Sequence, residues 1–139
     1  MIPFSGVTSL RQYVPNKPHP TGLKNFVLAS PSGLVLDFDI YQGKRFLNNT
    51  LPTNIGLGPS VVLRLSQSLP RGTAVFFDRY FTSLPLLQLL SDKVIRGTGT
   101  IMKNRIPKDV KLEQDNVLER LGRGSCDQVV RASDNVALV

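Results

Sequence analysis

The residues that point most directly to chemistry lie in the stretch 74–86, where an apolar run ends on a carboxylate. Val75, Phe76 and Phe77 lack the polar alternation of a half-exposed strand, so they predict a strand that is buried on both faces. Asp78 follows directly, and a carboxylate at the end of a buried strand is costly unless something binds it. Asp78 is therefore a candidate metal ligand, the alternative being an aspartate that only starts a turn.

A helix is expected directly after this carboxylate, because Thr82 or Ser83 can cap it and Pro85 suits its first turn. Its apolar residues are Leu84, Leu86, Leu87, Leu89 and Leu90. The β-like segment 94–101 follows the helix. Strand, helix and strand in succession predict a parallel pair of strands.

Upstream, residues 23–29 and 34–41 are apolar and β-rich, and the turn-forming residues 30–33 separate them, which predicts a hairpin. Apolar and polar residues alternate in the second run, so we expect one buried face and one face that carries Asp37 and Asp39. These two carboxylates could form a second carboxylate pair, but we favour an ordinary solvated strand face, because alternating polar residues are common on half-exposed strands. The face expected to be buried comprises Leu34, Leu36, Phe38 and Ile40.

The remaining segments are described by their composition. Residues 1–21 are rich in proline and basic residues and predict an extended basic segment, and residues 42–58 predict a polar loop. Within that loop, Gly56-Leu57-Gly58 is a weak match to a phosphate-binding turn, because it lacks a third glycine and does not directly follow a strand. A helix is expected from Pro59 until Pro70, since Val61, Val62, Leu65 and Leu69 recur at helical spacing.

Composition limits the classes of function. The chain has 139 residues, 41% of them hydrophobic, which suits one globular domain, and its formal net charge of +7 suggests an anionic partner, most often nucleic acid. An excess of positive charge also serves solubility alone. Cys126 is the single cysteine, so an intrachain disulfide and a cysteine-based zinc site are excluded, and we expect an intracellular protein. No run of about 18 apolar residues occurs, so we expect no membrane partner.

Several strings of residues together resemble the transposase domain of the piggyBac transposable-element-derived family. They are Met1-Ile-Pro-Phe, the two hairpin strands, Phe77-Asp-Arg-Tyr-Phe-Thr-Ser-Leu-Pro-Leu, and Gly97-Thr-Gly-Thr-Ile-Met-Lys-Asn-Arg. The resemblance runs from Met1 to about Arg105 and continues more loosely to the end of the chain. It implies an α/β fold with an RNase H-like transposase core, in which helices flank a mixed central sheet.

The resemblance also implies a division of the chain. Residues 1–139 would be a partial transposase domain that is truncated at both ends, with its core at 1–101. A basic and irregular segment would follow at 102–128, and a further strand would begin within 129–139.

The same resemblance implies a chemistry for Asp78. The family cuts and rejoins DNA with three aspartates that hold two divalent metals, and two Mg²⁺ ions roughly 4 Å apart stabilise the attacking and leaving oxygens. Asp78 matches the second aspartate, whereas the positions of the first and the third fall outside residues 1–139. Arg79 stands where the family usually has asparagine, and its cation would compete with a metal for Asp78. We therefore expect that this chain does not bind Mg²⁺ productively.

The resemblance implies DNA as the partner, namely transposon ends and TTAA targets, together with a nuclear or intracellular location and possible self-association. We expect the basic stretch near the Gly-Thr strand to contact phosphates, although a solvated loop explains it equally well. The residues expected to bind DNA are Lys93, Arg96, Lys103, Asn104, Arg105 and Lys108.

Three hypotheses for the function remain open. The first is a fragment or domesticated derivative of a piggyBac-type transposase that does not cut DNA by itself. The second is a non-catalytic DNA-binding or protein-interaction module that keeps the transposase fold. The third is an unrelated basic α/β domain that binds RNA.

Overall fold

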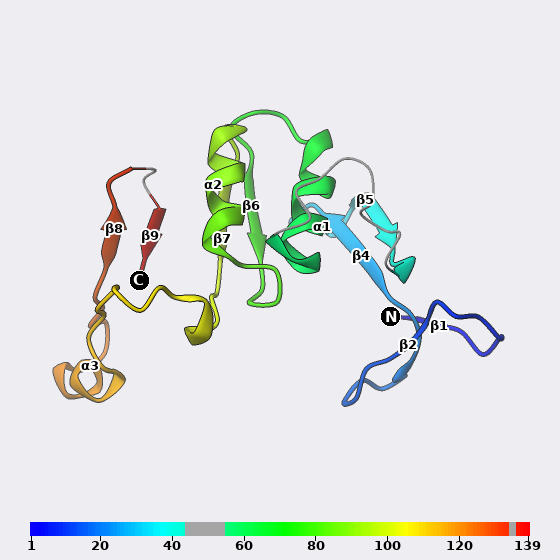
Figure 1. The fold of residues 1–139 in the computed structure, drawn as a ribbon, viewed down its shortest axis with the longest axis horizontal. Helices are drawn as coiled ribbons and strands as arrows, with labels where there is room; N and C mark the ends of the chain where they lie inside the picture. Colours follow the sequence, from blue (N-terminus) through cyan, green and yellow to red (C-terminus); the bar gives the residue numbers. More distant parts are fainter. Residues whose placement is uncertain (44–54, 134–135) are drawn as a thin grey trace. The chain divides into compact units, whose positions relative to one another are not determined.

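A computed structural model of the chain describes residues 1–43, 55–133 and 136–139 (Figure 1). Residues 44–54, most of the expected polar loop at 42–58, lie outside the described residues. The chain divides into two compact units, Met1–Leu69 and Pro70–Val139. The boundary between these units falls inside residues 1–101, the range assigned above to one core.

The first unit opens with three short strands where the sequence predicted only an extended segment. These strands are β1 (Ile2–Pro3), β2 (Arg11–Tyr13) and β3 (Thr21–Leu23), and β3 pairs antiparallel with both of the others. Gly22 lies in the central strand, where an added Cβ would collide with the carbonyl oxygen of Ile2. Glycine at this position therefore permits the close approach of β1 and β3.

The predicted hairpin is confirmed. It is formed by β4 (Asn25–Ala29) and β5 (Val35–Ile40), which pair antiparallel with an irregularity at Leu28 and Ala29. The turn closes through the Ser30 N–H, which donates to the Leu34 carbonyl at 2.8 Å. Gly33 has a φ of 88°, a backbone conformation that glycine adopts without steric cost.

The prediction of which face of β5 is buried was wrong. Leu34, Leu36 and Phe38 are 65%, 51% and 55% exposed, so the apolar face is open. The carboxylates lie on the covered face, because Arg64 of α1 (Leu57–Leu65) donates to Asp37 Oδ2 at 2.8 Å and forms an ion pair with Asp39 at 3.2 Å. The helix therefore docks on the hairpin partly through charge, which alternation of residue types does not reveal.

Helix α1 forms where the spacing of apolar residues predicted a helix. It starts after Gly56, so the glycines at 56 and 58 mark a helix start rather than a phosphate-binding loop. Val61, Leu63 and Leu65 are buried on it, and a 3-10 turn at Ser66–Ser68 leads to the end of the unit. Phe26 of β4 adds to this core with 4% of its surface exposed.

The second unit contains the predicted strand, helix and strand. Strands β6 (Ala74–Phe77) and β7 (Arg96–Gly99) pair in parallel, and α2 (Leu84–Asp92) connects them and contacts β7 (Figure 1). Ser83 caps the helix through a hydrogen bond from the Leu86 N–H to its Oγ at 3.3 Å. The elements expected on either side of Asp78 are thus present in the expected order.

Burial of β6 on both faces was a wrong prediction. Val75 is 7% exposed, whereas Phe76 is 78% exposed, so one face of the strand is covered and the other is open. Helix α2, whose Leu86 and Leu90 are fully buried, contacts the neighbouring strand β7. A run of apolar residues alone does not show whether one face or both faces of a strand are buried.

Residues 102–128 are more ordered than predicted. They contain a 3-10 turn at Lys103–Arg105 and a helix, α3 (Asp115–Leu121), which has no buried residue. Residues 129–139 include two antiparallel strands, β8 (Val129–Arg131) and β9 (Val136–Leu138), rather than the start of one. In the described residues the strands form four separate hydrogen-bonded sheets and no single mixed sheet.

Candidate site at the carboxyl end of the parallel strand pair

Asp78 lies at the carboxyl end of β6, where the parallel pair with β7 ends, and its side chain is exposed. Its carboxylate Oδ1 accepts a hydrogen bond from the Tyr80 N–H at 2.8 Å. Its backbone carbonyl accepts from the N–H groups of Phe81 and Thr82 at 3.1 and 3.2 Å, and from Thr82 Oγ1 at 2.9 Å. The residues after Asp78 therefore fold back on it as a closed loop, and we call residues 78–82 the Asp78 loop.

A cation from a distant part of the chain holds the other side of this loop. Arg105 Nη1 donates to the carbonyl oxygens of Arg79 at 3.2 Å, Tyr80 at 3.1 Å and Thr82 at 2.6 Å. Arg105 belongs to the 3-10 turn that follows β7, so the chain returns to the Asp78 loop immediately after the parallel pair. Among the described residues no ion pair joins Asp78 to Arg79, although the sequence suggested Arg79 as a counter-charge.

Gly99 fixes the distance between the end of β7 and the Asp78 loop. A Cβ at this position would lie 2.5 Å from both the Phe77 carbonyl oxygen and Thr82 Oγ1. Thr82 is 1% exposed and has no room to retreat. Only glycine allows the two strand ends to approach this closely.

The residues predicted to bind DNA divide into two groups. Lys103, Asn104, Arg105 and Lys108 follow the carboxyl end of β7, the end that pairs near Asp78. Lys93 and Arg96 lie at the amino end of β7, which at about 3.3 Å per residue is on the order of 10 Å away. The six residues therefore do not form one patch centred on Asp78.

At the amino end of β7, the basic group includes a residue that sequence reasoning missed. Arg96 Nη2 donates to the Gly72 carbonyl at 3.0 Å, and the Gly72 N–H donates to the Val94 carbonyl at 2.6 Å. Arg71 precedes Gly72 and Lys93 precedes Val94, and both of these basic residues are exposed at this end of β7. In the sequence Pro70-Arg71-Gly72 was interpreted only as a helix stop, and nothing local marked Arg71 as part of a basic group.

Lys103 is not a free cation, because its Nζ lies 2.7 Å from Asp115 Oδ2. The hydrogen bond from Lys103, and after it the Coulomb attraction of the same cation, lower the pKa of Asp115 from its ordinary value of 3.8. Both side chains are largely exposed, so the pair is screened by solvent. Asn104 and Lys108, by contrast, are exposed on the same segment, and their side chains form no ion pair within the described residues.

The donor set around Asp78 does not by itself suit a two-metal site. Within residues 1–43, 55–133 and 136–139, no three His, Cys, Asp or Glu side chains lie close enough to hold a metal ion together. Mg²⁺ is usually held by carboxylates together with water and substrate phosphates. Asp78 is one such carboxylate, and its Oδ1 already accepts the Tyr80 N–H.

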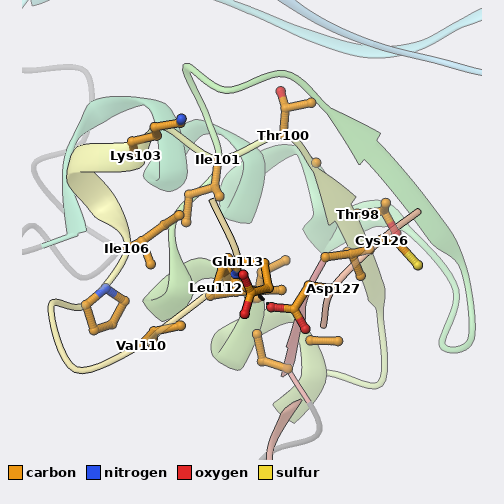
Figure 2. A pocket seen from close by; sticks show the side chains of 18 of the residues that line it. Thr98, Thr100, Ile101, Lys103, Ile106, Val110, Leu112, Glu113, Cys126 and Asp127 are labelled. Atoms are coloured by element: carbon orange, nitrogen blue, oxygen red, sulfur yellow. Dashed lines mark hydrogen bonds between the residues drawn. The ribbon is translucent and has the colours of Figure 1, made fainter. Parts of the chain in front are cut away.

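An open cavity of about 1790 Å³ lies in the second unit, and its lining includes Phe77 and Gly99 but not Asp78. Its lining includes Ile101, Lys103, Ile106 and Val110, which Figure 2 shows, and also Lys108. Figure 2 shows Leu112, Glu113 and Asp127 close together in it, where the Glu113 N–H donates to Asp127 Oδ2 at 2.9 Å. This hydrogen bond ties two segments of the cavity wall together.

Comparison with known proteins identifies the family. A family model described as Transposase IS4 matches residues 1–138. The chain belongs to the transposase IS4 family. Within this transposase family it is 34% identical over 140 residues to PiggyBac transposable element-derived protein 3 of Homo sapiens. The aligned region covers 98% of the chain and 23% of that relative.

Two further matches agree. PiggyBac transposable element-derived protein 2 of Homo sapiens is 30% identical over 141 residues, covering 98% of the chain and 23% of that protein. A cryo-EM structure of a piggyBac transposase synaptic complex with hairpin DNA matches with a TM-score of 0.63 and 26% identity over 91% of the chain and 25% of its own. The resemblance to piggyBac-derived proteins is thus confirmed, and this transposase-family chain spans about a quarter of the length of these relatives.

No helix in the described parts of this transposase-family chain has the length and apolar character needed to cross a membrane.

Proposed function

We propose that this chain is a transposase-derived segment that binds the DNA backbone and contributes Asp78 to a DNA-processing site. The observation that carries the proposal is the placement of Asp78 at the carboxyl end of a parallel strand pair, followed by a capped helix. In open α/β sheets, ligands bind beyond the carboxyl ends of the strands. The domain proposal is that residues 1–139 form part of one RNase H-like transposase domain, with the core at 1–101.

DNA as the partner is supported by charge and by the basic residues beside this end of the strands. The chain carries a formal net charge of +7, and Lys103, Asn104 and Lys108 lie on the exposed segment directly after β7. The solved structural neighbour is a piggyBac transposase bound to hairpin DNA. Phosphate contacts of this kind give an affinity that does not depend on the base sequence. We propose transposon ends and TTAA targets in the nucleus as the natural DNA.

We propose that Asp78 binds a metal ion only when further ligands are supplied from outside residues 1–139. The donor set within the described residues does not fit Mg²⁺ on its own. We therefore propose that residues 1–139 alone do not cleave DNA, and we assign no catalytic step to a metal held by these residues.

The proposal is tested by fluorescence anisotropy of labelled duplex DNA with the 139-residue chain at a series of salt concentrations. We expect the affinity to fall linearly on logarithmic axes as salt rises. Lys108→Gln, which removes an exposed cation of this segment, should reduce the steepness of that line by about 1 for the phosphate contact that is lost. Lys17→Gln, which removes an exposed cation of the first unit, is the control and should change the slope less. Absence of binding even at low salt would remove DNA as the partner.

A second candidate function is a protein-interaction module that keeps the transposase fold. The observation that favours it is the open apolar face of the hairpin, where Val27, Leu36 and Phe38 are 49%, 51% and 55% exposed. Self-association through this face would appear in sedimentation experiments as a concentration-dependent mass. Phe38→Ser should abolish that dependence while leaving DNA affinity unchanged, because Phe38 lies outside the basic segment and the substitution adds no charge.

A further inference from the structure

Two peptide units stand between Arg105 and Asp78. The peptide that joins Arg79 to Tyr80 accepts from Arg105 Nη1 through its carbonyl at 3.2 Å, and its N–H donates to Asp78 Oδ1 at 2.8 Å. The peptide that joins Tyr80 to Phe81 accepts at 3.1 Å and donates to the Asp78 carbonyl, also at 3.1 Å. Each peptide therefore has the cation at its carbonyl end and Asp78 at its N–H end.

This arrangement points both peptide dipoles from the Arg105 guanidinium toward Asp78, one at its carboxylate and one at its backbone carbonyl. Each peptide unit carries a dipole of about 3.5 D, with its positive end at the N–H and its negative end at the carbonyl. A cation at the carbonyl polarises the peptide and strengthens the hydrogen bond that the N–H donates, because linked hydrogen bonds polarise one another. A guanidinium keeps its charge at every relevant pH, so the effect is permanent.

The third bond of Arg105 holds the far end of the loop. Arg105 Nη1 lies 2.6 Å from the Thr82 carbonyl oxygen, and Thr82 is 1% exposed with its Oγ1 bonded to the Asp78 carbonyl at 2.9 Å. Arg105 itself is partly buried, unlike its exposed neighbours Lys103 and Asn104. Its Nη1 is thus directed at the loop rather than at solvent.

We propose that Arg105 is a positioning residue for Asp78: it fixes the carboxylate through the 79–80 peptide and the backbone carbonyl through the 80–81 peptide. The inference deepens the proposed function and rests on it, since a fixed Asp78 matters to function only where Asp78 serves a DNA-processing site. It also assigns Arg105 a role different from that of Lys103 and Lys108. The Nη1 of Arg105 is engaged with the loop and is not available to a phosphate.

The test uses native-state amide hydrogen exchange of the ¹⁵N-labelled 139-residue chain, without DNA or metal. The amides of Tyr80, Phe81 and Thr82 all donate to Asp78, so they report on the loop directly. Arg105→Ala should speed their exchange by about 10- to 100-fold and shift the Tyr80 amide resonance, while the α2 amides keep their rates. Arg96→Ala is the matched control, because Arg96 also donates to a backbone carbonyl but at the other end of β7.

Chemical rescue separates positioning from general stabilisation. Millimolar guanidinium, far below denaturing concentrations, should restore slow exchange and the Tyr80 resonance in Arg105→Ala. Equimolar urea, which has a similar shape and no charge, should not restore them. Equimolar sodium chloride should not restore them either. Equal acceleration of the loop and α2 amides, unchanged loop amides, or rescue by urea as effective as by guanidinium would each overturn the proposal.

If Arg105→Ala does not fold, Arg105→Lys tests the positioning role of Arg105 instead. An ammonium can donate three hydrogen bonds, but the lysine side chain is one bond shorter, so we expect loop exchange faster than in the wild type and unchanged α2 exchange. Loop amides as slow as in the wild type, or loop and α2 amides accelerated alike, would contradict it. Because no ligand is present, these results stand whether or not the chain binds DNA.

Discussion

At the residue scale, the cations of this chain differ in what they contact, although all contribute to the same net charge. Arg64 binds two carboxylates of the hairpin, Arg105 binds three backbone carbonyls, and Lys103 pairs with Asp115. Lys108 is exposed and extends from the segment after β7. The net charge therefore overstates the number of cations that are free to bind an anionic partner.

The Lys103–Asp115 pair predicts a pH dependence. Since the folded pKa of Asp115 lies below its ordinary value of 3.8, the pair contributes stability that is present above that value and is lost as pH falls through the lowered pKa. Lys103→Gln should raise the pKa of Asp115 toward 3.8, as followed by NMR titration of its side-chain carboxyl carbon. Lys108→Gln serves as the control and should leave the pKa of Asp115 unchanged. An unchanged Asp115 titration in Lys103→Gln would show that the pair does not persist in solution.

Arg64 predicts a stability effect in the first unit. Arg64→Ala removes the shared cation from Asp37 and Asp39, which are only 27% and 22% exposed at their side chains, and leaves two like charges on one strand face. We expect a loss of about 1–2 kcal/mol in the free energy of unfolding, measured with denaturant and far-UV circular dichroism. Adding Asp39→Asn to this variant should restore part of the loss, whereas no restoration would mean that helix packing, not charge, explains it.

At the element scale, the end of α2 is a Schellman motif built on an unusual residue. The Val94 N–H donates to the Ser91 carbonyl at 2.8 Å and the Ile95 N–H donates to the Leu90 carbonyl at 2.9 Å. Ile95 and Leu90 are both buried and supply the apolar contact that usually accompanies this motif. Val94, however, has a φ of 59°, a conformation that is unfavourable for a β-branched residue.

Val94 therefore predicts a stabilising substitution. Val94→Gly should raise the free energy of unfolding by about 0.5–1 kcal/mol, because relief of the left-handed strain exceeds the entropy that glycine adds to the unfolded chain. Val94→Ala is the matched control, since it keeps a Cβ in the same conformation and should gain less. Denaturant unfolding followed by far-UV circular dichroism measures both variants, and a less stable Val94→Gly would contradict the assignment of strain.

Local sequence signals predicted where the helices and strands of this chain lie. They did not predict which faces of those elements are buried. Ser83 and Pro85 marked the start of α2, and the turn at residues 30–33 marked the hairpin, because caps and turns depend on residues next to one another in sequence. The exposed Phe38 and Phe76 were assigned to buried faces, because burial depends on which element covers a strand. The bonds of Arg105 to the Asp78 loop span 23 to 26 residues and leave no local pattern in the sequence.

At the scale of the whole molecule, the chain matches a limited part of the length of its transposase-family relatives. It spans about a quarter of the relatives that it matches, and its described residues form two compact units with separate small sheets. Asp78 and its loop are nevertheless built entirely from the second unit, by β6, β7 and the turn that carries Arg105. The geometry around this carboxylate therefore does not depend on how the two units are arranged.

We propose that residues 1–139 position one carboxylate of a DNA-processing site and do not cut DNA by themselves. The most direct measurement is nicking of supercoiled plasmid by the 139-residue chain in the presence of Mg²⁺ or Mn²⁺, compared with Asp78→Ala. We predict no nicking above background in either protein. Metal-dependent nicking by the wild-type chain that Asp78→Ala abolishes would contradict the account, because it would show that these residues assemble a working site alone.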